Sequence, residues 1–179
     1  MESKIINKAI FLDRDGVINK EVNYLHKIDS FIFLEGIFDS CKHFISLGYV
    51  IIVITNQSGI ARGYYSQNDY QKLTNWMLNE FKKNGISILD IFHCPHSPKV
   101  NCDCRKPKPG MFLLAKKIHN IKLAQSWMIG DKETDIQAAN NAGIVNTILL
   151  ESGHEIKKEE SNAKFILKSI NLSKNIINT

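Results

Sequence analysis

The chain has 179 residues, of which 44% are hydrophobic and 23% are charged. This composition predicts one globular domain over residues 1–179 and excludes a disordered or fibrous protein. The formal net charge is +5, but the basic residues are spread along the chain and interleaved with acidic ones, so we expect no nucleic-acid partner.

The first predicted element is a buried strand that ends in two carboxylates. The apolar run 9–12 is too short for a helix, and Asp13, Asp15 and Gly16 follow it. At a strand end both carboxylates can face one cleft, because Gly16 lets the chain turn away tightly. One ionised carboxylate can attack phosphorus while a protonated neighbour protonates the leaving oxygen. Alone, the pair fits a helix N-cap beside a solvated acid equally well.

The rest of the chain predicts alternating helices and strands. The evidence is the spacing of apolar residues together with glycine stops and one Ser-x-x-Asp capping box. In chain order we expect a loop at 19–29, a small hairpin or edge strand at 31–34, a helix at 35–47, a strand at 49–54, a helix from Ser66 to Gly85, a strand at 86–93, a helix at 110–120, a strand at 126–129, a loop from Asp131 into a helix that ends at Gly143, a strand at 146–150, a short strand at 165–167 and a terminal helix.

This alternation predicts an α/β fold with one Rossmann-like, doubly wound parallel sheet and helices on both faces. The intervals between the elements leave no room for a separate cap domain. In such sheets ligands bind beyond the carboxyl ends of the strands. Four polar clusters follow strands directly or by one loop, so the fold should gather them at one rim: Asp13 with Asp15, Thr55 with Asn56, Arg105 with Lys106, and Asp131 with Asp135.

Together these clusters suit phosphoryl transfer. A phosphoryl group in transfer needs a metal, a fixed cation and neutral donors around its oxygens. Thr55 offers a hydroxyl, and Lys106 offers a charge that also keeps a neighbouring Asp13 ionised. Asp131 and Asp135 offer the hard oxygen ligands that Mg²⁺ prefers. Taken singly, Thr55 with Asn56 fits turn chemistry and Asp131 fits helix capping just as well.

A cysteine-rich loop spans residues 94–104. Three cysteines and a histidine within this short loop favour a closed structural Zn²⁺ site over a disulfide in a cytosolic chain. Redox chemistry and chance clustering are the alternatives. The fourth cysteine, Cys41, lies alone on a predicted helix and is expected to be a buried apolar residue. The expected zinc ligands are Cys94, His96, Cys102 and Cys104.

The motifs resemble those of the haloacid-dehalogenase-like (HAD-like) phosphatases. The matching residues are Asp13-Arg14-Asp15-Gly16, Thr55-Asn56, Lys106 and Gly130-Asp131-x-x-x-Asp135. The resemblance implies that Asp13 is the nucleophile and that Asp15 acts as general acid and then base. It also implies that Thr55 and Lys106 bind the phosphoryl group. Mg²⁺ would be held by Asp13, Asp131 and the backbone carbonyl of Asp15.

Longer matches at 11–16, 55–63, 94–96, 102–107 and 128–132 are similar to the capless branch that acts on heptose bisphosphates and histidinol phosphate. This resemblance implies removal of the 7-phosphate of a heptose 1,7-bisphosphate in nucleotide-activated heptose synthesis, with zinc purely structural. The substrate pocket would be formed by Glu21, Val22, Asn23, Tyr24, Asn56, Gln57, Ser58, Arg105 and Lys132.

The basic residues of the motif loops favour a substrate with a second anion. Arg62, Arg105, Lys108 and Lys132 exceed what one phosphate needs, and the planar fork of Arg105 suits a remote phosphate. We therefore expect a small-molecule sugar bisphosphate as the substrate. Histidinol phosphate is the nearest alternative, although the surplus of basic residues argues mildly against it. A non-catalytic phosphosugar-binding module would be expected to lose the nucleophile or the acid, and both are present.

The sequence also carries expectations about location and assembly. Residues 1–4 lead into the first strand without an apolar signal region, and no apolar run reaches membrane-spanning length. We therefore expect a cytoplasmic enzyme that does not bind a membrane and acts as a monomer.

Overall fold

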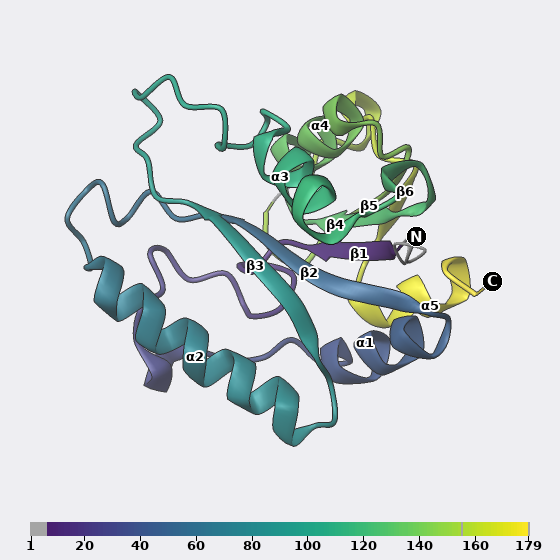
Figure 1. The fold of residues 1–179 in the computed structure, drawn as a ribbon, viewed down its shortest axis with the longest axis horizontal. Helices are drawn as coiled ribbons and strands as arrows, with labels where there is room; N and C mark the ends of the chain where they lie inside the picture. The colour runs from purple at the N-terminus through teal and green to yellow at the C-terminus, as the bar shows by residue number, and fades with distance from the viewer. Residues whose placement is uncertain (1–6, 155, 179) are drawn as a thin grey trace, which may run out of the picture.

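A computed structural model describes residues 7–154 and 156–178. Its centre is a six-stranded sheet in the order β3-β2-β1-β4-β5-β6 (Figure 1), and every neighbouring pair of strands is parallel. The strands are β1 (Lys8–Leu12), β2 (Tyr49–Asn56), β3 (Ile88–Cys94), β4 (Trp127–Gly130), β5 (Asn146–Leu150) and β6 (Phe165–Leu167). The helices are α1 (Ile37–Ser46), α2 (Gln67–Lys83), α3 (Gly110–His119), α4 (Glu133–Ala142) and α5 (Ser173–Ile176). The predicted doubly wound α/β fold is confirmed.

Helices cover both faces of the sheet (Figure 1). Helices α1, α2 and α5 lie on one face, and α3 and α4 lie on the other. Side chains of β1 alternate between the two apolar layers: Ile10 and Leu12 pack with the residues of α1 and α2, whereas Phe11 packs with those of α3 and α4. The Phe11 ring meets the Phe112 ring edge-on at 5.0 Å between centroids. Both faces of β1 are buried from Ala9 to Leu12, and this part of its sequence is continuously apolar.

The predicted capping box at the start of α2 is present. The Ser66 hydroxyl accepts a hydrogen bond from the Asp69 backbone N–H at 3.1 Å, and the Asp69 carboxylate accepts one from the Ser66 backbone N–H at 2.9 Å. These two bonds satisfy backbone donors that the first helical turn leaves free. They fix the point at which the loop after β2 turns into α2.

Of the two alternatives predicted for 31–34, the edge strand is wrong, but hairpin-like pairing with 18–20 is present. The Lys20 backbone N–H donates to the Ile32 carbonyl oxygen and the Leu34 backbone N–H donates to the Ile18 carbonyl oxygen, each at 2.9 Å. This segment makes a single antiparallel bridge, between Asn19 and Phe33, and is not a strand of the sheet. The Phe31 and Phe33 rings instead pack against Trp76 of α2, at 5.2 and 5.8 Å between centroids. Aromatic packing under α2 therefore holds the segment, which explains its apolar sequence. The predicted terminal helix is present as α5, which has 4 residues.

The strand order places a cleft at one rim of the sheet. Chain connections run in opposite directions on either side of the boundary between β1 and β4, which is where such folds bind ligands. Asp13 follows β1, Thr55 is the second-to-last residue of β2, and Asp131 follows β4. The three groups therefore meet at the carboxyl end of the central strands. In the described part of the chain, every helix falls short of the length and apolarity that a membrane crossing requires.

Candidate active site

A cavity of about 370 Å³ opens at this rim. Nearly all of the residues proposed from the sequence for phosphate and substrate binding contribute to its wall. Among the predicted catalytic and substrate-pocket residues, Val22 is the exception: it is 41% exposed and does not line the cavity. The lining residues are Asp13, Arg14, Asp15, Glu21, Asn23, Tyr24, Thr55, Asn56, Gln57, Ser58, Gly59, Tyr65, Arg105, Lys106, Lys132, Thr134, Asp135 and His154.

Lys106 lies at the floor of the cavity and is 3% exposed. Its Nζ is 3.0 Å from Asp13 Oδ1 and 2.7 Å from Asp135 Oδ1, and it donates to the carbonyl oxygen of Ile54 at 2.8 Å. Three partners thus satisfy all three ammonium hydrogens. Burial alone would lower the pKa of Lys106, but Asp13 and Asp135 hold it above its ordinary value. The lysine therefore remains a fixed positive charge.

Asp13 depends on this lysine for its charge. Burial raises the pKa of Asp13 to about 6, and it would rise further without the attraction of Lys106. The carboxyl group is therefore mostly ionised at neutral pH. Asp13 Oδ1 also accepts a hydrogen bond from the backbone N–H of Arg14 at 2.8 Å. Lys106 and Arg14 both engage Oδ1, so Oδ2 is the oxygen available to an incoming group.

Asp15 lies beside Asp13 and is held by several donors. The Arg14 guanidinium contacts both carboxylate oxygens, at 2.9 Å to Oδ1 and 2.8 Å to Oδ2. Asn19 Nδ2 donates to Oδ1 at 3.0 Å, and Gln57 Nε2 donates to Oδ2 at 3.2 Å. The same Arg14 group donates to the carbonyl oxygen of Leu25 at 3.1 Å. The loop after β1 is thereby tied to the carboxyl group.

Asn56, the last residue of β2, bonds to the backbone of Lys106. Its Nδ2 donates to the Lys106 carbonyl oxygen at 3.2 Å, and its Oδ1 accepts from the Lys106 backbone N–H at 3.1 Å. Both amide atoms are therefore engaged by the protein. We infer that Asn56, which the sequence predicts to bind substrate, also positions Lys106.

Asp131 lies beneath the cavity wall and is 0% exposed. Its carboxylate, with those of Asp13 and Asp135, offers oxygen atoms that all lie within 4.8 Å of one another. Asp131 Oδ1 is buried and has no hydrogen-bond partner among the described residues. Burial, with repulsion from Asp13 and Asp135, raises the pKa of Asp131 to about 9. A buried carboxylate with a free oxygen among like charges fits a divalent cation with hard oxygen ligands.

Glycine is required where the chain passes this carboxylate. A Cβ atom on Gly16 would lie 2.3 Å from Asp131 Oδ2, and one on Gly153 would lie 2.0 Å from it. Gly16 also has a φ of +83°, a conformation that costs other residues energy. The Asp-x-Asp-Gly sequence therefore reflects both the turn and the close approach of Asp131.

Two basic side chains other than Lys106 and Arg14 also line the cavity. Arg105 and Lys132 both line it, and Arg105 Nη1 is buried without a hydrogen-bond partner among the described residues. Lys132 Nζ is 3.3 Å from Glu21 Oε2. Arg62 and Lys108, which the sequence also suggested for a second anion, do not line the cavity. Arg62 instead lies 6.0 Å from the centroid of the Tyr24 ring.

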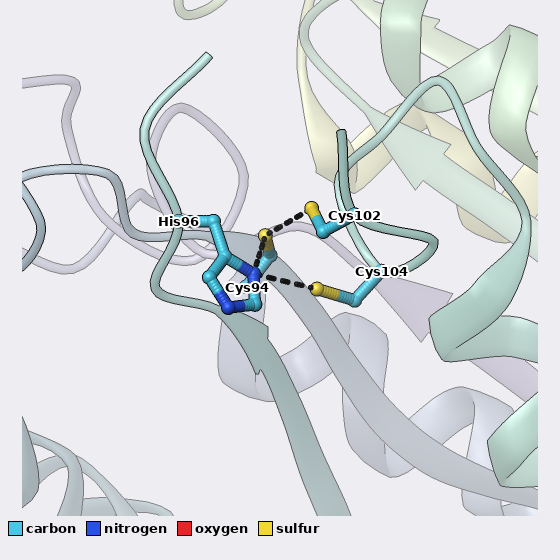
Figure 2. Close-up of side chains that lie close together, drawn as sticks. All are labelled: Cys94, His96, Cys102 and Cys104. Carbon is cyan, nitrogen blue, oxygen red and sulfur yellow. Dashed lines mark hydrogen bonds between the residues drawn. The ribbon is translucent and has the colours of Figure 1, made fainter. Parts of the chain in front are cut away.

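The cysteine loop brings its four expected ligands together (Figure 2). Cys94 Sγ lies 3.7 Å from Cys102 Sγ and 3.6 Å from His96 Nδ1, which is 3.2 Å from Cys104 Sγ. Tetrahedral zinc with Zn–S bonds of about 2.3 Å holds its sulfur ligands roughly 3.8 Å apart. The cluster therefore has the dimensions of a zinc site. Cys41 is buried in the core, as predicted.

Sequence reasoning missed Tyr65, Thr134 and His154, which also line the cavity. His154 follows β5, and its Nδ1 lies 2.7 Å from Asp131 Oδ2. The rule that placed the other groups, a polar residue after a strand's carboxyl end, applies to His154 as well. Tyr65 carries no such signal, because it lies in the loop before α2.

Comparison with known proteins agrees with this geometry. A family model described as HAD-hydrolase-like matches residues 103–172. The chain is 50% identical over 163 residues to D-glycero-alpha-D-manno-heptose-1,7-bisphosphate 7-phosphatase of Photorhabdus laumondii, covering 87% of this chain and 89% of the relative. The chain belongs to the HAD-like heptose-1,7-bisphosphate 7-phosphatase family.

Other members of this phosphatase family are similarly close. D-glycero-beta-D-manno-heptose-1,7-bisphosphate 7-phosphatase of Helicobacter pylori is 50% identical over 145 residues, covering 80% of this chain and 84% of the relative. The crystal structure of D,D-heptose 1,7-bisphosphate phosphatase from B. bronchiseptica, complexed with magnesium and phosphate, matches with a TM-score of 0.83. It is 28% identical and covers 94% of this chain and 97% of that one.

Replacing the buried lysine of this family member tests its structural role. Lys106→Met leaves Asp13 and Asp135 buried without their cation, so we expect the free energy of unfolding to fall by about 3–5 kcal/mol. Urea unfolding without divalent cations measures the loss. Lys108→Met is the matched control, since Lys108 Nζ is 3.8 Å from the fully exposed Asp103 and should contribute little. Equal losses in both variants would contradict the assignment.

Proposed function

We propose that the chain is a Mg²⁺-dependent phosphatase that removes the 7-phosphate of a heptose 1,7-bisphosphate. The observation that carries this proposal is the cavity in which Asp13, Asp15 and Lys106 lie together over the buried Asp131. These are the groups that phosphoryl transfer to a carboxylate needs. Family membership at 50% identity supports the substrate class.

In the first step Asp13 Oδ2 attacks phosphorus. A bond forms between this oxygen and phosphorus while the bond from phosphorus to the sugar oxygen breaks. Asp15 gives its proton to the departing sugar oxygen, so the sugar leaves as a neutral alcohol. Lys106, held at Asp13 Oδ1, orients the nucleophile and offsets its charge as the phosphate dianion approaches. Thr55 donates its hydroxyl hydrogen to a phosphoryl oxygen.

In the second step water attacks the phosphorus of the aspartyl phosphate. Asp15 takes a proton from this water, the bond between Asp13 and phosphorus breaks, and inorganic phosphate leaves. Asp13 is again a carboxylate and Asp15 is again protonated, so the cycle closes. The metal would be held by the carboxylates of Asp13 and Asp131 and by the backbone carbonyl of Asp15. When bound, Mg²⁺ supplies positive charge to the phosphoryl oxygens.

The remaining pocket residues could bind the second phosphate of a sugar bisphosphate. Arg105 offers a buried Nη1 that lacks a partner in the described part of the chain, and Lys132 is a second cation on the same cavity. A phosphate on the far end of a sugar would satisfy both. Glu21, Asn23 and Tyr24, on the loop after β1, line the same cavity, where they would meet sugar hydroxyls.

We further propose that Cys94, His96, Cys102 and Cys104 bind one structural Zn²⁺. The distances between the four ligand atoms support this assignment. Burial acts to raise the pKa of Cys102, but hydrogen bonds led by the Arg105 backbone N–H lower it to about 7, which favours the thiolate. The loop leads directly into Arg105 and Lys106, so the metal would fix the position of the backbone that carries these two basic side chains.

Phosphate release tests the function directly. We expect rapid, Mg²⁺-dependent release of one phosphate from an anomer of heptose 1,7-bisphosphate, no release in EDTA, and much slower release from histidinol phosphate. Both anomers are assayed, because relatives at equal identity are named for different anomers. Asp13→Asn controls for contaminating phosphatases. Faster turnover of histidinol phosphate would contradict the substrate, and no Mg²⁺-dependent release would contradict the function.

Arg105→Ala tests recognition of the second anion. Loss of a charge-assisted contact should raise KM for the bisphosphate by tenfold or more, roughly, while KM for a simple monoester changes little. Steady-state kinetics on both substrates measure the difference. Lys108→Ala is the control, because Lys108 lies nearby but outside the cavity lining. Equal effects of Arg105→Ala on both substrates would remove Arg105 from recognition.

Elemental analysis tests the zinc assignment. Purified protein should retain about one zinc per chain after dialysis with Mg²⁺, and Cys104→Ala should lose the zinc and melt at a lower temperature. Cys41→Ala is the control, since Cys41 lies in the core and outside the cluster. Zinc-free protein with native stability would contradict a structural metal.

A further inference from the structure

A chain of hydrogen bonds runs along the cavity wall from Tyr65 to the reacting groups. The Tyr65 hydroxyl donates to Gln57 Oε1 at 2.6 Å. Gln57 Nε2 donates to Thr55 Oγ1 at 2.8 Å and to Asp15 Oδ2 at 3.2 Å. Thr55, Gln57 and Tyr65 are 1%, 2% and 6% exposed, so water competes little for these bonds.

The direction of each bond follows from the chemistry of the groups. An amide has one oxygen that only accepts and one nitrogen that carries two hydrogens. Because Tyr65 donates to the oxygen, both amide hydrogens point to the reacting side, one to Thr55 and one to Asp15. A flipped amide would no longer donate to Thr55 Oγ1 or Asp15 Oδ2, and it would leave Tyr65 without an acceptor. Tyr65 therefore favours the orientation in which the Gln57 amide donates to both Thr55 and Asp15.

This orientation also sets what Thr55 can do. Thr55 Oγ1 accepts a hydrogen from Gln57, so its own hydroxyl hydrogen remains free for a phosphoryl oxygen in the cavity. If the amide oxygen faced Thr55 instead, the Thr55 hydroxyl would donate its hydrogen to that oxygen. The hydrogen would then not be available to bind a phosphoryl oxygen. Whether the Thr55 hydroxyl can donate to the substrate thus depends on the Tyr65 hydroxyl, which orients the Gln57 amide.

The protein holds the Tyr65 ring firmly in place. The ring stacks on His26, with 5.3 Å between centroids and 14° between planes. On another side it contacts Gly59, where an added Cβ would lie 2.2 Å from Tyr65 Cε1 and 2.9 Å from its hydroxyl oxygen. A side chain at position 59 would thus displace the phenol.

We propose that Tyr65 is a positioning residue for the phosphatase reaction, acting through Gln57 to orient Asp15 and to keep the Thr55 hydroxyl hydrogen available to the substrate. This inference rests on the proposed function and adds a residue to it. Burial, outweighing the attraction of Arg14, raises the pKa of the Tyr65 hydroxyl to about 12. The hydroxyl therefore stays a donor throughout the neutral range.

Removal of the single hydroxyl tests the proposal. Tyr65→Phe should lower kcat on the sugar bisphosphate by about three- to tenfold, the usual range for one buried hydrogen bond, with KM changed less than about twofold. Tyr64→Phe is the matched control, because Tyr64 is 54% exposed and its hydroxyl has no hydrogen bond to any described residue. Wild-type kcat in Tyr65→Phe would overturn the proposal.

A double-mutant cycle separates positioning from a merely structural effect. In a Gln57→Leu background Tyr65→Phe should have no further effect on kcat, because the amide through which it acts is gone. An equal fold-loss in both backgrounds would overturn the proposal. It would show that the phenol acts by packing or stability alone.

A measurement without turnover keeps this inference distinct from the proposed function. NMR of the Gln57 side-chain amide, assigned by its absence in Gln57→Leu, should show slow hydrogen exchange in the wild type and at least about tenfold faster exchange in Tyr65→Phe. Equal exchange rates would overturn the orienting role even in an active enzyme. A wild type with the expected exchange but no phosphatase activity would refute the proposed function and leave the orienting bond standing.

Discussion

The active-site architecture depends on one buried ammonium group shared by two carboxylates. Lys106 Nζ lies 3.0 Å from Asp13 and 2.7 Å from Asp135, and all three side chains are nearly inaccessible to water. Without that charge the burial of Asp13 would favour its neutral form, which is a poor nucleophile. Asp135 in turn accepts the backbone N–H groups of Asp131 and Lys132, at 3.2 and 3.1 Å. The lysine thus joins the proposed nucleophile, Asp13, to the loop that carries the proposed metal ligand Asp131.

The sheet makes this arrangement possible because residues far apart in sequence end at the same edge. Asp13 and Asp131 follow β1 and β4, which are hydrogen-bonded neighbours, and Thr55 lies on β2 on the other side of β1. Lys106 is delivered by a loop instead, and Asn56 holds its backbone there by two hydrogen bonds. The proposed zinc cluster lies just before this lysine, so the metal and Asn56 would fix the loop from two sides.

Much of this could be predicted from the sequence. Continuous apolar runs reveal buried parallel strands, and the polar residues after them, such as Asp13 and Asp131, fall at a predictable rim. Side-chain direction in loops could not be predicted, so Val22 was grouped with Tyr24 although it does not line the cavity. The segment 31–34 is apolar because it packs under α2, a tertiary contact that resembles a strand in sequence. Tyr65 was missed because its role depends on the hydrogen-bond direction of one buried amide.

The central claim is that Asp13 is the group that receives the phosphoryl group. Enzyme quenched during turnover and reduced with borohydride should carry homoserine at position 13, because the reductant converts an aspartyl phosphate to the alcohol. Peptide mass spectrometry locates this change, with Asp13→Asn as the blank. We predict homoserine at position 13, formed only when substrate and Mg²⁺ are present. Homoserine at position 15, 131 or 135 instead, with an unmodified Asp13, would contradict the account.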